Sequence, residues 1–122
     1  GSFWEGADFA QQDKVIEIIT RLPFDNPKDP FYQKIESLFS KQGKSTFDSY
    51  SLPMMVLRFK QAIGRAQRRP EQRSAILLMD NRPLVKSYGK LFIKEVSQEV
   101  TLRHAPFKQI KEDIQEFLEK EC

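Results

Sequence analysis

The chain has 122 residues, of which 39% are apolar and 30% are charged, a composition that predicts one domain with a single core. Its formal net charge of +3 is too even to indicate nucleic acid binding by itself. A single cysteine (Cys122) and a single histidine (His104) give no material for a disulfide framework, a Cys/His metal site or a catalytic triad, so no metal ligands are expected.

Strand and helix signals alternate from the beginning of the chain. The run VIEII (15–19) is β-branched and almost entirely apolar, as in a strand covered on both faces, and Pro23 follows it. The turn-rich segment DNPKDP comes next. Its last two residues, Asp29 and Pro30, are a typical start for a helix, which we expect over about residues 31–39.

A second helix and a second strand are predicted in the middle of the chain. The polar segment 43–51 predicts a connection, in which Ser51 is a suitable N-cap for the next helix. Pro53 would lie in the first turn of that helix, and Pro70 would stop it. The apolar run AILLM (75–79) predicts a second buried strand.

Two more helices are expected toward the C-terminus, over residues 87–96 and 106–119. The order β, α, α, β, α, α predicts an α/β fold with short parallel strands and flanking helices. Because a stable open sheet usually needs about four or more strands, the chain is expected to be part of a larger α/β domain, or to complete its core by association. No apolar run is long enough for a membrane span, and a cytoplasmic location is expected.

The predicted second helix has two chemically different faces. At about 100° per residue, its apolar side chains fall in one sector and a basic group falls in another: Arg58, Gln61, Arg65, Arg68 and Arg69. Guanidinium groups bind phosphate oxygens through two donors at once and neutralise charge during phosphoryl transfer. The pattern alone favours a basic, solvated helix face over a phosphate site, because Arg-rich surface helices are common.

Several motifs resemble those of the XPD/DinG branch of superfamily two helicases. QAIGRAQR (61–68) is similar to their motif six, QxxGRxxR, and SFWEGADF (2–9) is similar to their motif five. VIEIITRLPFDNPKDP (15–30) and SYGKLFI (87–93) resemble family segments in the same order. The resemblance is closest to the DinG type, and it implies that residues 1–96 are the C-terminal portion of the second RecA-like (P-loop NTPase-like) helicase lobe, followed by a helical tail over 97–122.

The resemblance also implies roles for individual residues. Arg65 and Arg68 would be catalytic arginine fingers that reach the γ-phosphate of ATP. The residues implied to contribute to the nucleotide site are Gln61, Gly64, Glu5, Gly6 and Asp8. Those implied to contact single-stranded DNA are Ser2, Trp4 and Arg58.

The sequence contains no GxxxxGK[ST] phosphate loop and no acidic metal-binding box after a strand. ATP and Mg would therefore be bound mainly by other parts of a longer helicase, including its first lobe, and we expect no ATP hydrolysis by this chain alone.

Two alternatives remain open at this point. The chain could be a non-unwinding, nucleic-acid-binding module of a DnaQ-like exonuclease fusion, or a structural fragment with no activity. Because a partial lobe exposes sheet edges and apolar surface, a homodimer of the isolated chain is also expected.

Overall fold

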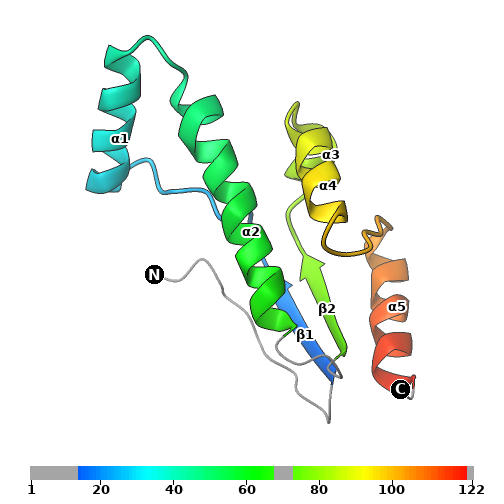
Figure 1. The fold of residues 1–122 in the computed structure, drawn as a ribbon. Coiled ribbons are helices and arrows are strands. Elements are labelled where there is room, and N and C mark those ends of the chain that lie inside the picture. The colour runs from blue at the N-terminus through cyan, green and yellow to red at the C-terminus, as the bar shows by residue number, and fades with distance from the viewer. Residues whose placement is uncertain (1–13, 68–72, 121–122) are drawn as a thin grey trace.

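The computed structural model describes residues 14–67 and 73–120. Two strands, β1 (Lys14–Ile19) and β2 (Arg73–Leu78), pair in parallel, with Lys14 opposite Arg73 and Ile19 opposite Leu78. Parallel strands need a crossover connection, and here it contains the helices α1, η1 and α2 (Figure 1). The expected α/β class with a parallel strand pair and flanking helices is confirmed.

Helix α1 (Pro30–Lys41) begins as the sequence predicts. The Asp29 carboxylate accepts a hydrogen bond from the Phe31 amide at 2.9 Å, and Pro30 occupies the first turn. The helix continues two residues past the expected end, and Gly43 follows with a φ of 69°, which a glycine adopts without steric cost. No residue of α1 is buried, and the helix projects from the rest of the molecule (Figure 1).

The second helix begins earlier than expected. Residues Phe47–Ser51 form the π-helix η1, which continues directly into α2 (Leu52–Ala66). The prediction that this whole segment is a polar connection was therefore wrong, as was the prediction that Ser51 caps a helix. Ser51 has helical dihedral angles, because the residues before it are already helical. It is buried, and its hydroxyl points toward the Tyr32 hydroxyl.

The C-terminal part contains one helix more than expected. The short helix α3 (Arg82–Val85) follows β2, and α4 (Gly89–Ser97) and α5 (Phe107–Glu119) lie close to the predicted ranges. Four residues are too few for an apolar repeat to develop, so periodicity could not reveal α3. The Lys14 ammonium donates to the carbonyls of Leu118 and Lys120, which fastens the end of α5 to the start of β1.

The core lies between α2, α4 and one face of the sheet. Its fully or nearly buried side chains are Ile19, Leu22, Leu52, Met55, Phe59, Ile63, Phe92 and Val96. Strand β1 is largely buried, as expected, but every residue of β2 is only half-buried, which contradicts the prediction of a second buried strand. The described helices include none with the length and apolarity to cross a membrane.

Candidate functional site

Helix α2 separates apolar and polar residues onto two faces, as its sequence predicts. Its buried residues are Leu52, Met55, Phe59, Ala62, Ile63 and Ala66. Gln61, Gly64 and Arg65 are exposed on the other side of the helix. Since the apolar face is held by the core, the polar face is presented in a fixed direction.

The exposed residues Gln61, Gly64 and Arg65 lie toward the end of the sheet where the two strands begin. Gln67, which follows α2, accepts a hydrogen bond from the hydroxyl of Ser74 at 2.6 Å, close to the start of β2. The chain also enters β1 at Lys14, so the start of the parallel partner lies at the same end. The C-terminal end of α2 therefore lies near the amino-terminal ends of both strands (Figure 1), and Arg65 is in the last turn of that helix.

Arg58 has a different environment from Arg65. Its guanidinium donates to the Pro23 carbonyl at 3.2 Å and forms an ion pair with Asp25 at 3.1 Å. The side chains of Arg58 and Asp25 are only 19% and 11% exposed. These contacts fasten the loop after β1 to α2, and they give Arg58 a structural role that the sequence did not predict. The expected DNA contact of Arg58 stays a prediction.

Gly64 in α2 and Gly89 in α4 differ in the space that is available for a side chain. A Cβ atom at Gly89 would lie 1.9 Å from the Pro83 carbonyl oxygen, so the contact between α3 and α4 requires a glycine there. A Cβ atom at Gly64 would meet no described atom within 4 Å. Glycine in a helix interior is less favourable than alanine by about 0.5–1 kcal/mol, so packing within the described residues gives no reason for Gly64.

Six of the predicted site residues lie outside the described residues: Ser2, Trp4, Glu5, Gly6, Asp8 and Arg68. The structure thus brings together Gln61, Gly64 and Arg65 on one helix face. Arg58 lies on the same side of α2, two turns earlier, but its guanidinium is held by Pro23 and Asp25. Among the described residues, no group of three or more His, Cys, Asp or Glu side chains is arranged to hold a metal ion.

The opposite end of the sheet carries a network centred on Asp80. Its carboxylate accepts hydrogen bonds from the backbone amides of Leu22 at 2.9 Å and Arg82 at 3.0 Å, and from the Arg82 Nε at 2.8 Å. Asp80 therefore caps the end of β2. The Arg82 guanidinium also lies over the ring of Phe24, which packs edge-on against Tyr88. This network joins the loops that follow β1 and β2.

The network determines the ionisation of Asp80. Burial alone would raise the pKa of this carboxyl, but the hydrogen bonds from the Arg82 side chain and from the amides of Leu22 and Arg82 outweigh that effect. The pKa of Asp80 is lowered from 3.8 to about 2. Burial raises the pKa of Tyr88.

Replacing Asp80 with asparagine is expected to destabilise the fold by about 1–2 kcal/mol at pH 7. Because the folded pKa is the lower one, the ionised carboxylate stabilises the fold fully above pH 3.8, and this contribution is lost as the pH falls toward about 2. Urea unfolding of both proteins at pH 7 and near pH 2.5 checks this. The difference should shrink at acid pH, and an equal difference at both pH values would contradict it.

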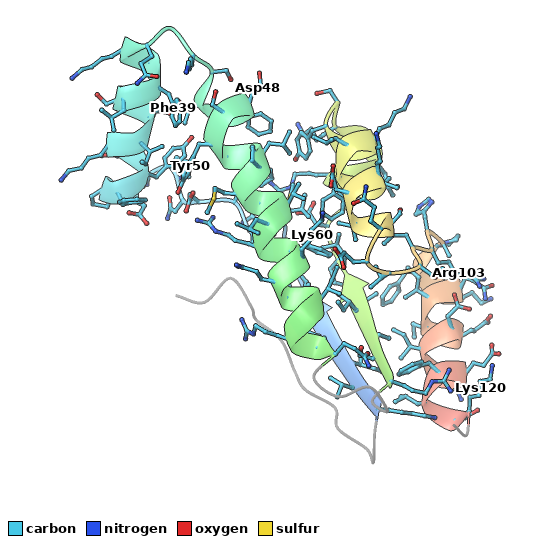
Figure 2. The ribbon with its side chains drawn as sticks, viewed as in Figure 1. Phe39, Asp48, Tyr50, Lys60, Arg103 and Lys120 are labelled. Atoms are coloured by element: carbon cyan, nitrogen blue, oxygen red, sulfur yellow. The ribbon has the colours of Figure 1, made fainter. Side chains whose placement is uncertain are left out.

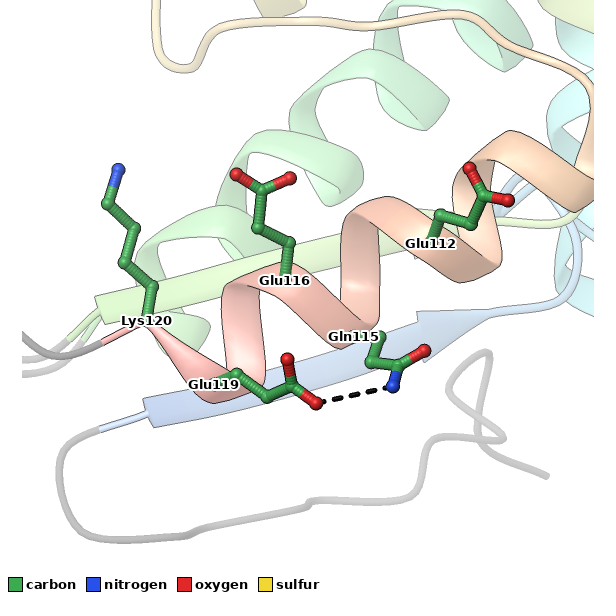
Figure 3. Close-up of a pocket in the computed structure, with 5 residues that line it drawn as sticks. All are labelled: Glu112, Gln115, Glu116, Glu119 and Lys120. Carbon is green, nitrogen blue, oxygen red and sulfur yellow. Dashed lines mark hydrogen bonds between the residues drawn. The ribbon is translucent and has the colours of Figure 1, made fainter.

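Three glutamates line a pocket on the exposed side of α5. Glu112, Glu116 and Glu119 lie along it with Gln115 and Lys120, and Gln115 donates a hydrogen bond to Glu119 at 3.2 Å (Figure 3). Lys108 and Lys111 are also exposed on this helix, so the exposed carboxylates and ammonium groups of α5 balance and give the helix no strong charge of either sign.

Comparison with protein families identifies the class of the chain. Residues 1–99 match the helicase C-terminal domain family, and the chain belongs to that family. The expected fold, part of a RecA-like second helicase lobe, is confirmed by this match and by the parallel strand pair. No solved structure matches the chain at a significant level.

Relatives of the chain include bacterial proteins named DinG and YoaA. The chain is 40% identical over 91 residues to the 3'-5' exonuclease DinG of Bacillus subtilis strain 168, which covers 75% of this chain and 10% of the relative. It is 35% identical over 92 residues to the ATP-dependent DNA helicase YoaA of Escherichia coli K12, which covers 75% of this chain and 14% of the relative.

A third relative matches the C-terminal residues as well. The 3'-5' exonuclease DinG of Staphylococcus aureus strain NCTC 8325 is 35% identical over 116 residues, covering 95% of this chain and 12% of the relative. Because the match covers 95% of the chain, it includes most of the tail beyond Val96, which lies outside the motifs quoted above. The chain spans between 10% and 14% of the lengths of these three relatives.

Proposed function

We propose that this chain is the C-terminal part of the second RecA-like lobe of a DinG-type, ATP-dependent DNA helicase. Residues 1–96 complete the lobe, and residues 97–122 form its helical tail. The first lobe of the same polypeptide faces the exposed side of α2 and supplies the phosphate loop and the ligands for Mg. The helicase acts in the cytoplasm. When isolated, the chain forms a homodimer that covers its exposed apolar surface.

The observation that supports this function best is the exposed group formed by Gln61, Gly64 and Arg65. A glycine that costs helix stability, with open space where its side chain would be, fits a surface that another lobe or a nucleotide approaches closely. The neighbouring Arg65 is exposed on the same face. A guanidinium held on a rigid, core-anchored helix is suited to bind a γ-phosphate.

In the proposed mechanism, the lobes close and Arg65 and Arg68 donate hydrogen bonds to the γ-phosphate, where negative charge spreads during transfer. Gln61 donates to the same group. Glu5, Gly6 and Asp8 couple this contact to single-stranded DNA, which Ser2, Trp4 and Arg58 hold. Asp8 is six residues from Lys14 in the sequence, and Lys14 starts β1 at the same end of the sheet as Arg65.

Changing Gly64 to alanine is expected to separate stability from activity. The free energy of unfolding should rise by about 0.5–1 kcal/mol, because alanine favours the helix and the added Cβ meets open space. DNA-stimulated ATP hydrolysis by the longer polypeptide should fall by roughly 10- to 100-fold, because the methyl group displaces the approaching lobe or nucleotide. Urea unfolding and an ATPase assay measure the two effects.

Gly89→Ala provides the contrast, because its Cβ would collide with the Pro83 carbonyl and should reduce stability. Unchanged ATP hydrolysis in the Gly64 variant would contradict the proposed close approach.

A second candidate function is a nucleic-acid-binding module in a 3'-5' exonuclease that does not unwind DNA. The names of the Bacillus and Staphylococcus relatives favour it. In that case the longer polypeptide would degrade DNA from its 3' end without hydrolysing ATP, and the Gly64 variant would degrade DNA at the normal rate. Assays of both activities on one preparation separate the two functions.

A further inference from the structure

Helix α5 lies outside the matched family domain and docks without burying a side chain. The family match ends at residue 99, and α5 begins at Phe107. No residue of α5 is buried, although Ile110, Ile114 and Phe117 line a groove together with residues of β2. A helix of 13 residues is only marginally stable in water by itself, so its contacts with the rest of the chain decide whether it stays folded.

Lys14 holds the last turn of this helix. Its ammonium donates to the Leu118 carbonyl at 3.1 Å and to the Lys120 carbonyl, and it lies 5.9 Å from the centroid of the Phe117 ring. A cation at the carboxyl end of a helix is stabilised by the helix dipole and by carbonyls that lack an intrahelical partner. Because Lys14 is only 8% exposed, these carbonyls replace most of the water that would otherwise solvate its ammonium.

The polar attachment near the other end of α5 is weaker. Arg103 pairs with Asp113 at 3.1 Å, but the Arg103 side chain is 68% exposed, so water screens this ion pair. Figure 2 labels Arg103 and Lys120 near the two ends of the helix. Docking of α5 therefore depends mainly on Lys14 and on the apolar side chains that line the groove.

Lys14 also lies where several parts of the proposed site meet. It is the first residue of β1, and the residue after it pairs with Ser74 of β2. The Ser74 hydroxyl donates to Gln67, directly after α2, whose last turn carries Arg65. In the sequence, Lys14 follows Asp8 by six residues. The carboxyl end of α5 is thus connected, through the starts of both strands, to the helix that presents Arg65.

We infer that Lys14 is a positioning residue: it locks the tail helix α5 onto the start of β1 and thereby fixes the segment through which bound DNA stimulates ATP hydrolysis. This inference rests on the proposed function, in which Glu5, Gly6 and Asp8 couple the nucleotide contact to single-stranded DNA. Because α5 buries no side chain, loss of one ammonium is enough to release it. A tail that only covered the groove would stabilise the fold without changing the coupling.

Replacing Lys14 with methionine in the longer polypeptide tests the inference, because methionine keeps a flexible apolar chain and removes the ammonium. Hydrogen–deuterium exchange in the last turn of α5 should become faster by roughly 10-fold as the helix undocks and unfolds. The ratio of DNA-stimulated to DNA-free ATP hydrolysis should fall by roughly 10-fold. Lys14→Arg keeps the charge and should restore most of both. Lys108→Met makes the same charge change at an exposed position of α5 and should alter neither.

Phe117→Ala weakens the same docking from the side of α5 and guards against an effect of Lys14 on folding alone. It should also lower the ratio, and combining it with Lys14→Met should add little, because both variants break one contact. Full additivity of the two variants would overturn the inference, as would faster exchange in α5 with an unchanged ratio. Unchanged exchange in Lys14→Met would overturn it too, since Lys14 would then not hold the tail.

Failure of the proposed function is seen separately in the unaltered polypeptide. If that polypeptide does not hydrolyse ATP, the helicase function is refuted and the coupling with it, even where exchange shows that Lys14 holds α5. If it hydrolyses ATP and the ratio is unchanged in Lys14→Met, the coupling is refuted and the helicase function stays intact.

Discussion

Replacing Arg65 with alanine is expected to lower DNA-stimulated ATP hydrolysis by the longer polypeptide by roughly 10³- to 10⁵-fold, the range typical of arginine fingers. The physical reason is the loss of a forked donor at the point where the transferring phosphoryl group accumulates charge. Binding of single-stranded DNA should be nearly unchanged. Steady-state ATPase rates and a fluorescence titration with labelled single-stranded DNA measure the two quantities.

Three control variants sharpen this test. Arg65→Lys keeps the charge but loses the fork, so it should recover only a small part of the activity. Lys94→Ala removes an exposed cation from α4 and should leave hydrolysis unchanged. Arg58→Ala should lower the free energy of unfolding by about 1–3 kcal/mol, because it leaves the Asp25 carboxylate without its ion pair, and it should also weaken binding of single-stranded DNA. Equal losses of hydrolysis and DNA binding in Arg65→Ala would argue against a finger role.

The contrast between Arg58 and Arg65 shows that helical periodicity predicts the face of a residue but not its contacts. The two residues are seven positions apart, so they lie only about 20° from one another around the axis of α2. The sequence correctly predicted which face of the helix is buried. It could not predict that the loop carrying Pro23 and Asp25 folds against Arg58, because that contact depends on how the chain turns after β1.

Long elements with a strong local pattern were predictable from the sequence. The residues that specify the element lie within the element itself in strand β1, in helix α1 with its Asp29 cap, and in helix α5. The π-helix η1 and the short helix α3 have no such signal and depend on the segments they join. The half-burial of β2 could not be predicted either, because an apolar run does not show whether both faces of a strand are covered.

The candidate site was predictable only in part. Physical reasoning gave a basic helix face, and resemblance to the helicase family gave the roles of its residues. The open space at Gly64 and the structural contacts of Arg58 became apparent only from the coordinates. Both observations concern what lies next to a residue in space, and residue spacing along one helix holds no information about that.

Replacing Phe92 with alanine is expected to have the largest effect on stability, about 3–5 kcal/mol. Phe92 is 2% exposed, and its ring packs edge-on against that of Phe59 with the centroids 5.0 Å apart, which holds α4 against α2. Truncation leaves a cavity in the core, and domains of this size are stable by only about 5–15 kcal/mol.

The neighbouring Leu91 is the matched control, because it is 44% exposed on the same helix and its change to alanine should cost less than about 1 kcal/mol. Urea unfolding followed by circular dichroism compares the two variants. If both variants lost the same small amount of unfolding free energy, Phe92 would not be the residue that holds α4 against α2.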